Sequence, residues 1–463
     1  MKYFLSLSIA ATLLSACHCK TTEQAKEEAC CSTVDETKLL KVSADNRFLE
    51  TADGEPFWWM GETAWLLSGK LSKEEASMYL KKRKEQGFNV IQISPVHYLG
   101  IKDVYGHSAL LDNDLSKPLV KEGEDDYWDN LDYMIDEAEK NGQYMAIVPV
   151  WGNNVRDGHV SREQMAVYGK FIAERYAERD NIIWLNGGDT FGNDSIETWN
   201  ILGNALHTYA PNHLATYHPR GRMQSNDWFN DQEWLDFNMI QSGHRSWSQD
   251  DTERGYGQDN WRYIVEDWDI QRPTIDGEPG YEGIPHGLHN PEDPYWEASD
   301  VRRYAYWSLF SGAFGYTYGH NATMQFYSKK DDGSAFGCKV YWQEAMNAIG
   351  SNQMQWVSKL MRSHKFNNRR PAQDLIAGEN GEKYDYITAT LGDNYAYVYT
   401  YNGRTFSLNM GLLAGEKIKA KWFDPSTGDY TEIGEIANTG VQEFDAPGVK
   451  RDGNDWVLVL ETI

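Results

Sequence analysis

The sequence predicts an α/β fold, a (β/α)8 TIM barrel followed by a small all-β sandwich. Three observations support this prediction. Short apolar runs alternate with helical stretches over residues 57–361, and short strand-like runs separated by turns replace them after about residue 365. In addition, 463 residues are too many for one ordinary domain and enough for a barrel plus a small module. Strand followed by helix, repeated eight times, is typical of a TIM barrel.

The elements of the barrel can be assigned in order. A hairpin over residues 41–57, with a turn at Asp53-Gly54, is expected to cover one end of it. The predicted strands are 57–61, 89–93, 144–150, 182–186, 214–218, 238–241, 273–277 and 313–318, the sixth having the weakest pattern. Helices are expected at 73–86, 127–141, 161–179, 196–209, 258–270 and 298–311, with a closing helix at 341–361. The barrel domain, including the hairpin, therefore spans residues 39–362.

The C-terminal region, residues 365–463, reads as a β-sandwich. Residues 384–390, 395–400 and 456–460 are apolar or alternating, and turn residues such as Asn402-Gly403 lie between such runs. The region is either a separate binding module or a packed companion of the barrel, and we favour the companion.

The N-terminus carries an export signal. Lys2 precedes an apolar run from Tyr3 to Ala16, which is too short to span a bilayer but fits a signal peptide over residues 1–16. Leu14-Ser15-Ala16-Cys17 resembles a bacterial lipobox, which implies cleavage before Cys17 and acylation of that residue. The alternative is an ordinary signal peptide cut near Ala16. Residues 17–38 are mostly polar and read as a tether. We therefore expect an exported, membrane-anchored lipoprotein in the periplasm or on the cell surface.

Composition narrows the possible partners. With 44 Lys+Arg against 69 Asp+Glu, the formal charge of -25 argues against nucleic-acid binding, which depends on cationic contacts to phosphate. The 18 Trp and 28 Tyr favour a carbohydrate partner, because aromatic faces stack on the C–H faces of sugar rings. Four of the five Cys lie in residues 17–31 and Cys338 is alone, so neither a disulfide framework nor a metal site is expected, and no cofactor is implied. Any contact with a membrane is expected only through the lipid anchor.

Two carboxylates stand where a barrel places its chemistry. The active site of such a barrel lies at the C-terminal ends of the strands. Asp189 follows the fourth predicted strand and Glu278 the seventh, each beside glycines that let a ligand approach. Glycoside hydrolysis needs such a pair, one to protonate the leaving oxygen and one to attack or to activate water. Asp276 is expected to point the same way as Glu278, one layer deeper, as a supporting residue. No nucleophile elbow and no phosphate-binding Gly motif is present.

Three motifs resemble those of the apiosidase-like barrel hydrolases of glycoside hydrolase family 140. They are the opening segment from Asn46 to Trp65, the fourth-strand motif 184–189, and Asp276-Gly277-Glu278-Pro279. The resemblance covers residues 39–362. It implies that Asp189 is the acid/base and Glu278 the nucleophile of a retaining enzyme. It further implies exo-removal of apiose from the pectic polysaccharide rhamnogalacturonan II. An endo-acting hydrolase of the same barrel type and a catalytically inactive surface glycan-binding lipoprotein remain the alternatives.

The residues that follow the other strands are then expected to bind substrate. They are Glu62, Trp65, His97, Trp151, Asn153, His218, Arg220, Gln241, His244 and His320. Arg220 is expected to pair with a uronate of the aglycone by bidentate hydrogen bonds. For each histidine, a buried structural hydrogen bond is the alternative.

Overall fold

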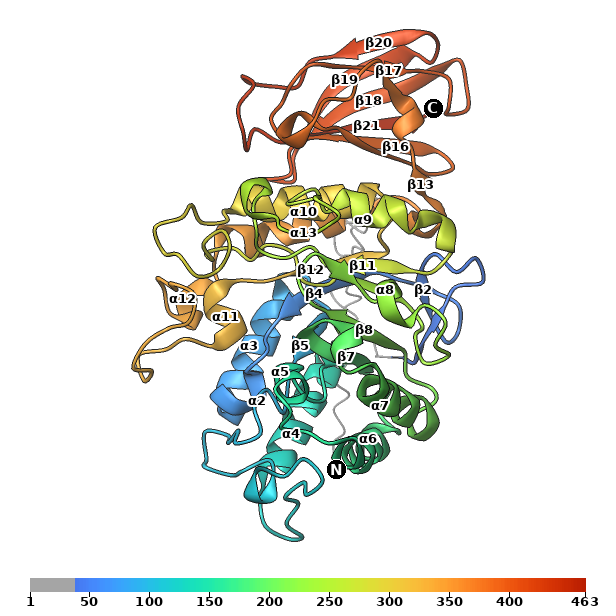
Figure 1. Ribbon diagram of the computed structural model, residues 1–463. Helices are drawn as coiled ribbons and strands as arrows, with labels where there is room; N and C mark the ends of the chain where they lie inside the picture. The colour runs from blue at the N-terminus through green and yellow to red at the C-terminus, as the bar shows by residue number, and fades with distance from the viewer. Residues whose placement is uncertain (1–37) are drawn as a thin grey trace, which may run out of the picture. The chain divides into compact units, whose positions relative to one another are not determined.

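The computed structural model describes residues 38–463 (Figure 1). The predicted signal peptide, Cys17 and residues 17–37 of the tether lie outside the described residues. Within residues 38–463, every helix is too short or too polar to cross a bilayer.

The predicted barrel is present. Its eight parallel strands are β4 (Trp59–Thr63), β5 (Val90–Ile93), β6 (Tyr144–Ile147), β7 (Ile182–Thr190), β8 (Ala215–Pro219), β10 (Asn238–Gln241), β11 (Thr274–Asp276) and β12 (Gly315–Tyr318). The sheet order is β8-β7-β6-β5-β4-β12-β11-β10-β9, where β9 (Met223–Gln224) is a short antiparallel addition to β10. The strand bodies are buried on both faces, as parallel strands covered by helices must be.

A serine joins β8 to β10, the two strands that share no continuous ladder. The Ser225 hydroxyl donates to the Tyr217 carbonyl at 2.8 Å and accepts from the Met239 amide at 2.8 Å. The Thr216 hydroxyl also donates to the Phe237 carbonyl at 2.5 Å. Backbone hydrogen bonds between β8 and β10 are missing at this position. The hydroxyl groups of these side chains bind the backbone polar groups instead, so those groups stay satisfied.

Helices cover the outside of the barrel and several begin with strong caps. Ser72, Asp126 and Ser161 each form a capping box at the start of a helix, which satisfies orphan backbone N–H groups. The helices are α2 (Leu67–Lys70), α3 (Lys73–Glu85), α4 (Tyr127–Lys140), α5 (Asn153–Arg156), α6 (Arg162–Tyr176), α7 (Ile196–Tyr209), α8 (Asn226–Phe229), α9 (Trp261–Glu266), α10 (Ala298–Phe310), α11 (Asn321–Gln325), α12 (Trp342–Ala345) and α13 (Ile349–Met361). Single 3₁₀ turns lie at Leu111–Asn113, Gly192–Asp194, Trp247–Gln249, Trp268–Ile270, Phe366–Asn368, Gln373–Leu375 and Lys383–Asp385.

Two predicted helices are broken. The stretch 258–270 forms only α9 and a 3₁₀ turn, since the buried Asp267 between them receives hydrogen bonds from Asn226, Gln224 and Asn238. The stretch 341–361 forms α12 and α13. Its break falls at Met346, whose carbonyl accepts from the side chains of Arg83 and Gln86 and not from a helical amide.

Two small β regions flank the barrel in sequence. The N-terminal one is the antiparallel sheet of β1 (Leu40–Val42), β2 (Leu49–Thr51) and β3 (Pro56–Phe57), where the hairpin was predicted. The C-terminal one is a sandwich of a six-stranded and a three-stranded sheet. Its strands are β13 (Arg370–Pro371), β14 (Ile376–Ala377), β15 (Thr388–Leu391), β16 (Tyr395–Thr400), β17 (Phe406–Asn409), β18 (Lys417–Phe423), β19 (Tyr430–Ala437), β20 (Val441–Phe444) and β21 (Trp456–Thr462).

The middle of the six-stranded sheet is buried on both faces, as the fully buried β16 shows, whereas its edge strand β19 is largely exposed. In β16, Ala396 and Val398 enter the core of the sandwich, whereas Tyr397 and Tyr399 belong to the core of the barrel domain, as the two-residue period of a strand requires. The Tyr399 ring stacks on that of Tyr306 from α10 with centroids 4.8 Å apart. A buried ion pair, Arg302–Asp455, joins the same surfaces at 2.6 Å. The sandwich therefore packs tightly on the barrel (Figure 1).

Candidate active site

Glu278 lies just after β11, with one histidine close to each of its carboxylate oxygens. His218 Nε2, from β8, is 2.9 Å from Oε2, and His244 Nε2, in the loop after β10, is 3.1 Å from Oε1. The preceding Gly277 packs closely against Met239, because a Cβ there would lie 1.9 Å from Met239 Cε and would force that side chain to move. The structure thus brings together three residues that the sequence placed on three different strands.

The two histidines keep Glu278 ionised. Burial alone would raise the pKa of this carboxyl, but the hydrogen bonds and charges of His218 and His244 outweigh burial and lower the pKa of Glu278 to about 2. An ionised carboxylate with only 6% exposure is suited to act as nucleophile or base.

The position of the proton on His244 follows from its second nitrogen. The Tyr281 amide donates to His244 Nδ1 at 3.4 Å, so Nδ1 accepts and the ring N–H on Nε2 faces Glu278. The Tyr281 ring also packs edge-on against His244, with centroids 4.5 Å apart. Sequence reasoning missed Tyr281, although its place three residues after Glu278 in the same loop was a usable signal.

Asp189 lies at the distorted end of β7. The backbone of Gly187, Gly188 and Asp189 has positive φ at all three residues, and the pairing of β7 with β8 shifts register there. Cβ atoms at Gly187 and Gly188 would come within 2.5 Å of Tyr217 and 3.0 Å of Trp151, so both positions need glycine. Asp189 itself, at φ 51, is a non-glycine residue in the left-handed region, a strained state that occurs often at functional sites.

The environment of Asp189 favours its protonated form. Burial, and then the negative charge of Glu278, raise the pKa of Asp189 above its usual value, against smaller opposing effects of His218, Arg220 and His244. His218 also connects the two acidic segments, because its Nδ1 lies 3.3 Å from the Asp189 amide while its Nε2 faces Glu278. Two carboxyls with oppositely shifted pKa values are the pattern expected of an acid and a nucleophile or base.

Aromatic rings line the site beside these carboxylates. The Trp151 ring centroid is 4.6 Å from that of His97, 5.0 Å from Trp65 and 5.6 Å from His218. Burial lowers the pKa of His97 to about 4 despite the charge of Glu278, so this ring is neutral near pH 7. The four rings, all predicted to bind substrate, form one cluster next to Glu278, where a sugar ring can stack.

Three further predicted residues lie near Asp189 and Glu278. Asn153 begins α5 directly after Gly152, whose amide donates to the Gly188 carbonyl at 3.1 Å. The side chain of Arg220 lies over the Phe191 ring at 5.2 Å. Gln241 ends β10, and its buried Oε1 accepts no hydrogen bond from a described residue. The supporting role expected of Asp276 fits its contacts, because Ser242 and Asn260 donate to its buried carboxyl at 2.7 and 2.9 Å.

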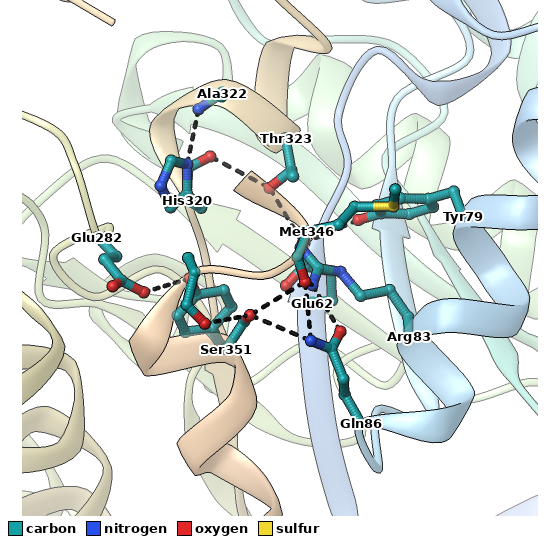
Figure 2. Close-up of polar contacts among 12 residues, drawn as sticks. Glu62, Tyr79, Arg83, Gln86, Glu282, His320, Ala322, Thr323, Met346 and Ser351 are labelled. Carbon is teal, nitrogen blue, oxygen red and sulfur yellow. Dashed lines mark hydrogen bonds and ion pairs between the residues drawn. The ribbon is translucent and has the colours of Figure 1, made fainter. Parts of the chain in front are cut away.

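Glu62 lies in the protein core. Its carboxylate is fully buried and accepts from Arg83 and Tyr79, both at 2.8 Å, and from Thr323 at 3.1 Å. Figure 2 shows Glu62 enclosed by these side chains, with Gln86 beside Arg83. This geometry argues against the predicted contact with substrate, because the carboxylate is fully buried and Oε1 already accepts all three hydrogen bonds. We assign Glu62 a structural role.

His320 is also engaged by the protein. Its Nδ1 accepts from the Ala322 amide at 3.0 Å and so caps the start of α11 (Figure 2). The ring is 5% exposed, and burial lowers the pKa of His320 to about 3. Of the two readings given for the histidines, the structural one fits His320, whereas His97, His218 and His244 lie beside Glu278.

Comparisons with known families match both parts of the chain. The family model "Apiosidase-like, catalytic domain" matches residues 43–368. The model "Putative collagen-binding domain of a collagenase" matches residues 370–461. Among curated proteins, none matches the sequence.

Solved structures are similar over nearly the whole chain. One, described as "Glycoside hydrolase", is 42% identical with a TM-score of 0.89 and covers 92% of this chain and 97% of its own. A glycoside hydrolase family 5 structure from Bacteroides vulgatus ATCC 8482 is 40% identical with a TM-score of 0.88, covering 93% of each chain. Another glycoside hydrolase structure from that strain, 16% identical with a TM-score of 0.65, supports the fold alone.

Proposed function

Since the chain belongs to the apiosidase-like glycoside hydrolases, we propose that it is a retaining, exo-acting β-apiosidase that acts on pectic rhamnogalacturonan II. The single observation that supports a catalytic role most directly is the pair of oppositely tuned carboxyls, Asp189 and Glu278. In this mechanism Asp189 protonates the leaving oxygen while Glu278 attacks the anomeric carbon. Asp189 then acts as base toward the water that releases the sugar.

The position of Arg220 supports a substrate whose aglycone carries an acidic group. Its charge acts on Asp189, the residue that would protonate the leaving group, and among the described residues it has no ion-pair partner within 4 Å. A guanidinium so placed is free to bind a uronate carboxylate by paired hydrogen bonds. The proposed apiose-bearing uronate of pectin would supply that carboxylate.

Product analysis tests the proposal. The protein is incubated with pectic oligosaccharides that bear terminal apiose, and the released sugars are identified. Free apiose as the first product supports the exo-acting apiosidase. Larger oligosaccharides without any monosaccharide would favour the endo-acting alternative, and binding without turnover would favour the inactive glycan-binding lipoprotein.

We expect hydrolysis with retention of the anomeric configuration. Asp189 lies near the end of β7 and Glu278 just after β11, and His218 contacts both segments, so a separation of about 5 Å between the carboxyl groups is expected. A gap that short leaves no room for a water, and direct attack by Glu278 becomes the available route. Proton NMR of the first-formed product decides the matter. Initial appearance of the opposite anomer would make Glu278 a general base of an inverting enzyme.

We propose that the mature protein is held at the membrane through acylated Cys17. Cys17→Ala is expected to move the protein from the membrane fraction to the soluble periplasmic fraction, because two or three acyl chains anchor far more firmly than one. Fractionation followed by immunoblotting measures this. Finding the unaltered protein already in the soluble fraction would contradict the lipobox interpretation.

A further inference from the structure

The loop between β5 and α4, residues 94–126, follows the carboxyl end of a barrel strand (Figure 1). It holds exposed aromatic rings. Near its start, His97 contacts Trp151 in the active site. Tyr98 and Tyr105 follow and are 51% and 48% exposed. Because this loop follows the carboxyl end of a barrel strand, it lies on the same face as Glu278.

A buried carboxylate orders the outer turn of this loop. The Asp103 side chain is fully buried and accepts from the amides of Tyr105 and His107 at 3.0 and 2.9 Å, while its second oxygen lies 3.0 Å from His107 Nδ1. The Tyr105 hydroxyl also accepts from the Lys73 amide at 3.0 Å. The Tyr105 and His107 rings are thereby held with centroids 6.1 Å apart and an interplanar angle of 35°.

These rings stand at a hollow of about 450 Å³ between the starts of α3 and α4. Its lining residues are Lys73, Tyr105, His107, Asp125, Asp126 and Asn130. Asp125 is exposed and has no hydrogen-bond or ion-pair partner among the described residues. Asn130 is 2% exposed, and neither atom of its amide has a hydrogen-bond partner within residues 38–463. Donors and acceptors are therefore left for a bound molecule beside an ordered aromatic face.

We propose that this hollow is a second carbohydrate-binding site, which takes an uncharged sugar residue of the polysaccharide away from the bond that is cleaved. The exposed ring of Tyr105 offers a stacking face at low entropic cost, because hydrogen bonds already fix it. The carboxylate of Asp125 accepts hydrogen bonds from sugar hydroxyls. The exposed carboxylate of Asp125 repels a uronate, so a neutral sugar is favoured. This proposal depends on the chain being a glycoside hydrolase, but not on which sugar it cleaves.

Affinity electrophoresis tests the site with galactan, arabinan and polygalacturonate cast separately into native gels. The full-length protein is compared with Tyr105→Ala, Asp125→Ala and the control Tyr209→Ala, whose exposed ring ends α7 on the opposite end of the barrel. The unaltered protein and the control are expected to be retarded by a neutral polysaccharide more than by polygalacturonate. Tyr105→Ala and Asp125→Ala should bind the neutral polysaccharide at least about fivefold more weakly. Asp125→Ala leaves the turn that Asp103 orders intact, so it still tests the site if Tyr105→Ala disturbs folding.

A second readout separates this site from the catalytic centre. Hydrolysis of a short oligosaccharide, which cannot reach both sites, should proceed at the unaltered rate in Tyr105→Ala and Asp125→Ala. Equal retardation of all four proteins, or no retardation by either neutral polysaccharide, would overturn the proposal. Absence of apiose release would instead contradict only the proposed function, because retardation by galactan or arabinan does not depend on it.

Discussion

Replacement of Glu278 or Asp189 by alanine is expected to lower turnover by about three orders of magnitude or more. Glu278→Ala removes the ionised group that His218 and His244 hold at the site, so no side chain remains to attack the anomeric carbon. The surrounding strands keep their packing, because Glu278 lies after β11 and not within it. Thermal unfolding should therefore remain cooperative, and the loss should appear in kcat.

Asp189→Ala removes the group that transfers a proton to the leaving oxygen. The raised pKa of Asp189, caused by burial and then by the charge of Glu278, keeps a proton available for the leaving oxygen. Its loss removes general acid catalysis, which alone contributes about 10²–10⁴-fold. Substrates with good leaving groups need less protonation, so Asp189→Ala should retain more activity on an activated aryl glycoside than on the natural bond. Glu278→Ala should lose activity on both substrates.

Initial rates on both substrates, with circular dichroism to monitor folding, measure these effects. Asp194→Ala is the matched control, because this exposed carboxylate lies in the 3₁₀ turn just after β7. It should retain nearly full activity. Near-normal turnover in Asp189→Ala or Glu278→Ala would remove that residue from the mechanism.

The positions of the catalytic pair could be read from the sequence because each follows a recognisable strand. The apolar runs before Gly187-Gly188 and before Gly277 locate the buried parts of β7 and β11, and barrel topology then places both carboxylates on one face. The sequence could not show that His218 contacts both segments, since this depends on the register of β8 against β7. The contacts of Glu278 with His218 and His244 arise only when three strands that are distant in sequence pack side by side.

Glu62 and His320 show what a position at a strand end does not reveal. Both residues occur at strand ends, as rim residues do, but their partners are set by helices that pack against the barrel. Arg83 lies in the run Lys81-Lys82-Arg83-Lys84, which reads as a solvated helix face, and only the packing of α3 reveals that this one cation is fully buried. The cap formed by His320 likewise depends on α11, a five-residue helix that was not predicted.

The second large effect concerns stability: Glu62→Ala is expected to lower the free energy of unfolding by about 3–5 kcal/mol. The pair Glu62–Arg83 is fully buried, with Arg83 Nη2 2.8 Å from Glu62 Oε1. Burial opposes the charge of Arg83, but Glu62 together with Tyr79 and Tyr318 outweighs burial and raises the pKa of Arg83. Without Glu62, a guanidinium that cannot lose its proton stays in the core with only the neutral acceptors Gln86 and the Met346 carbonyl.

Denaturant unfolding of Glu62→Ala and of the control Glu197→Ala measures this effect. Glu197 also pairs with an arginine, Arg162, but both side chains are about 60% exposed, so solvent compensates for the loss and stability should hardly change. The same proteins separate the structural role of Glu62 from the predicted substrate contact. A structural role lowers the unfolding midpoint and leaves KM nearly unchanged at temperatures where the variant is folded. Wild-type stability together with a raised KM would return Glu62 to the substrate-binding residues and contradict the burial argument.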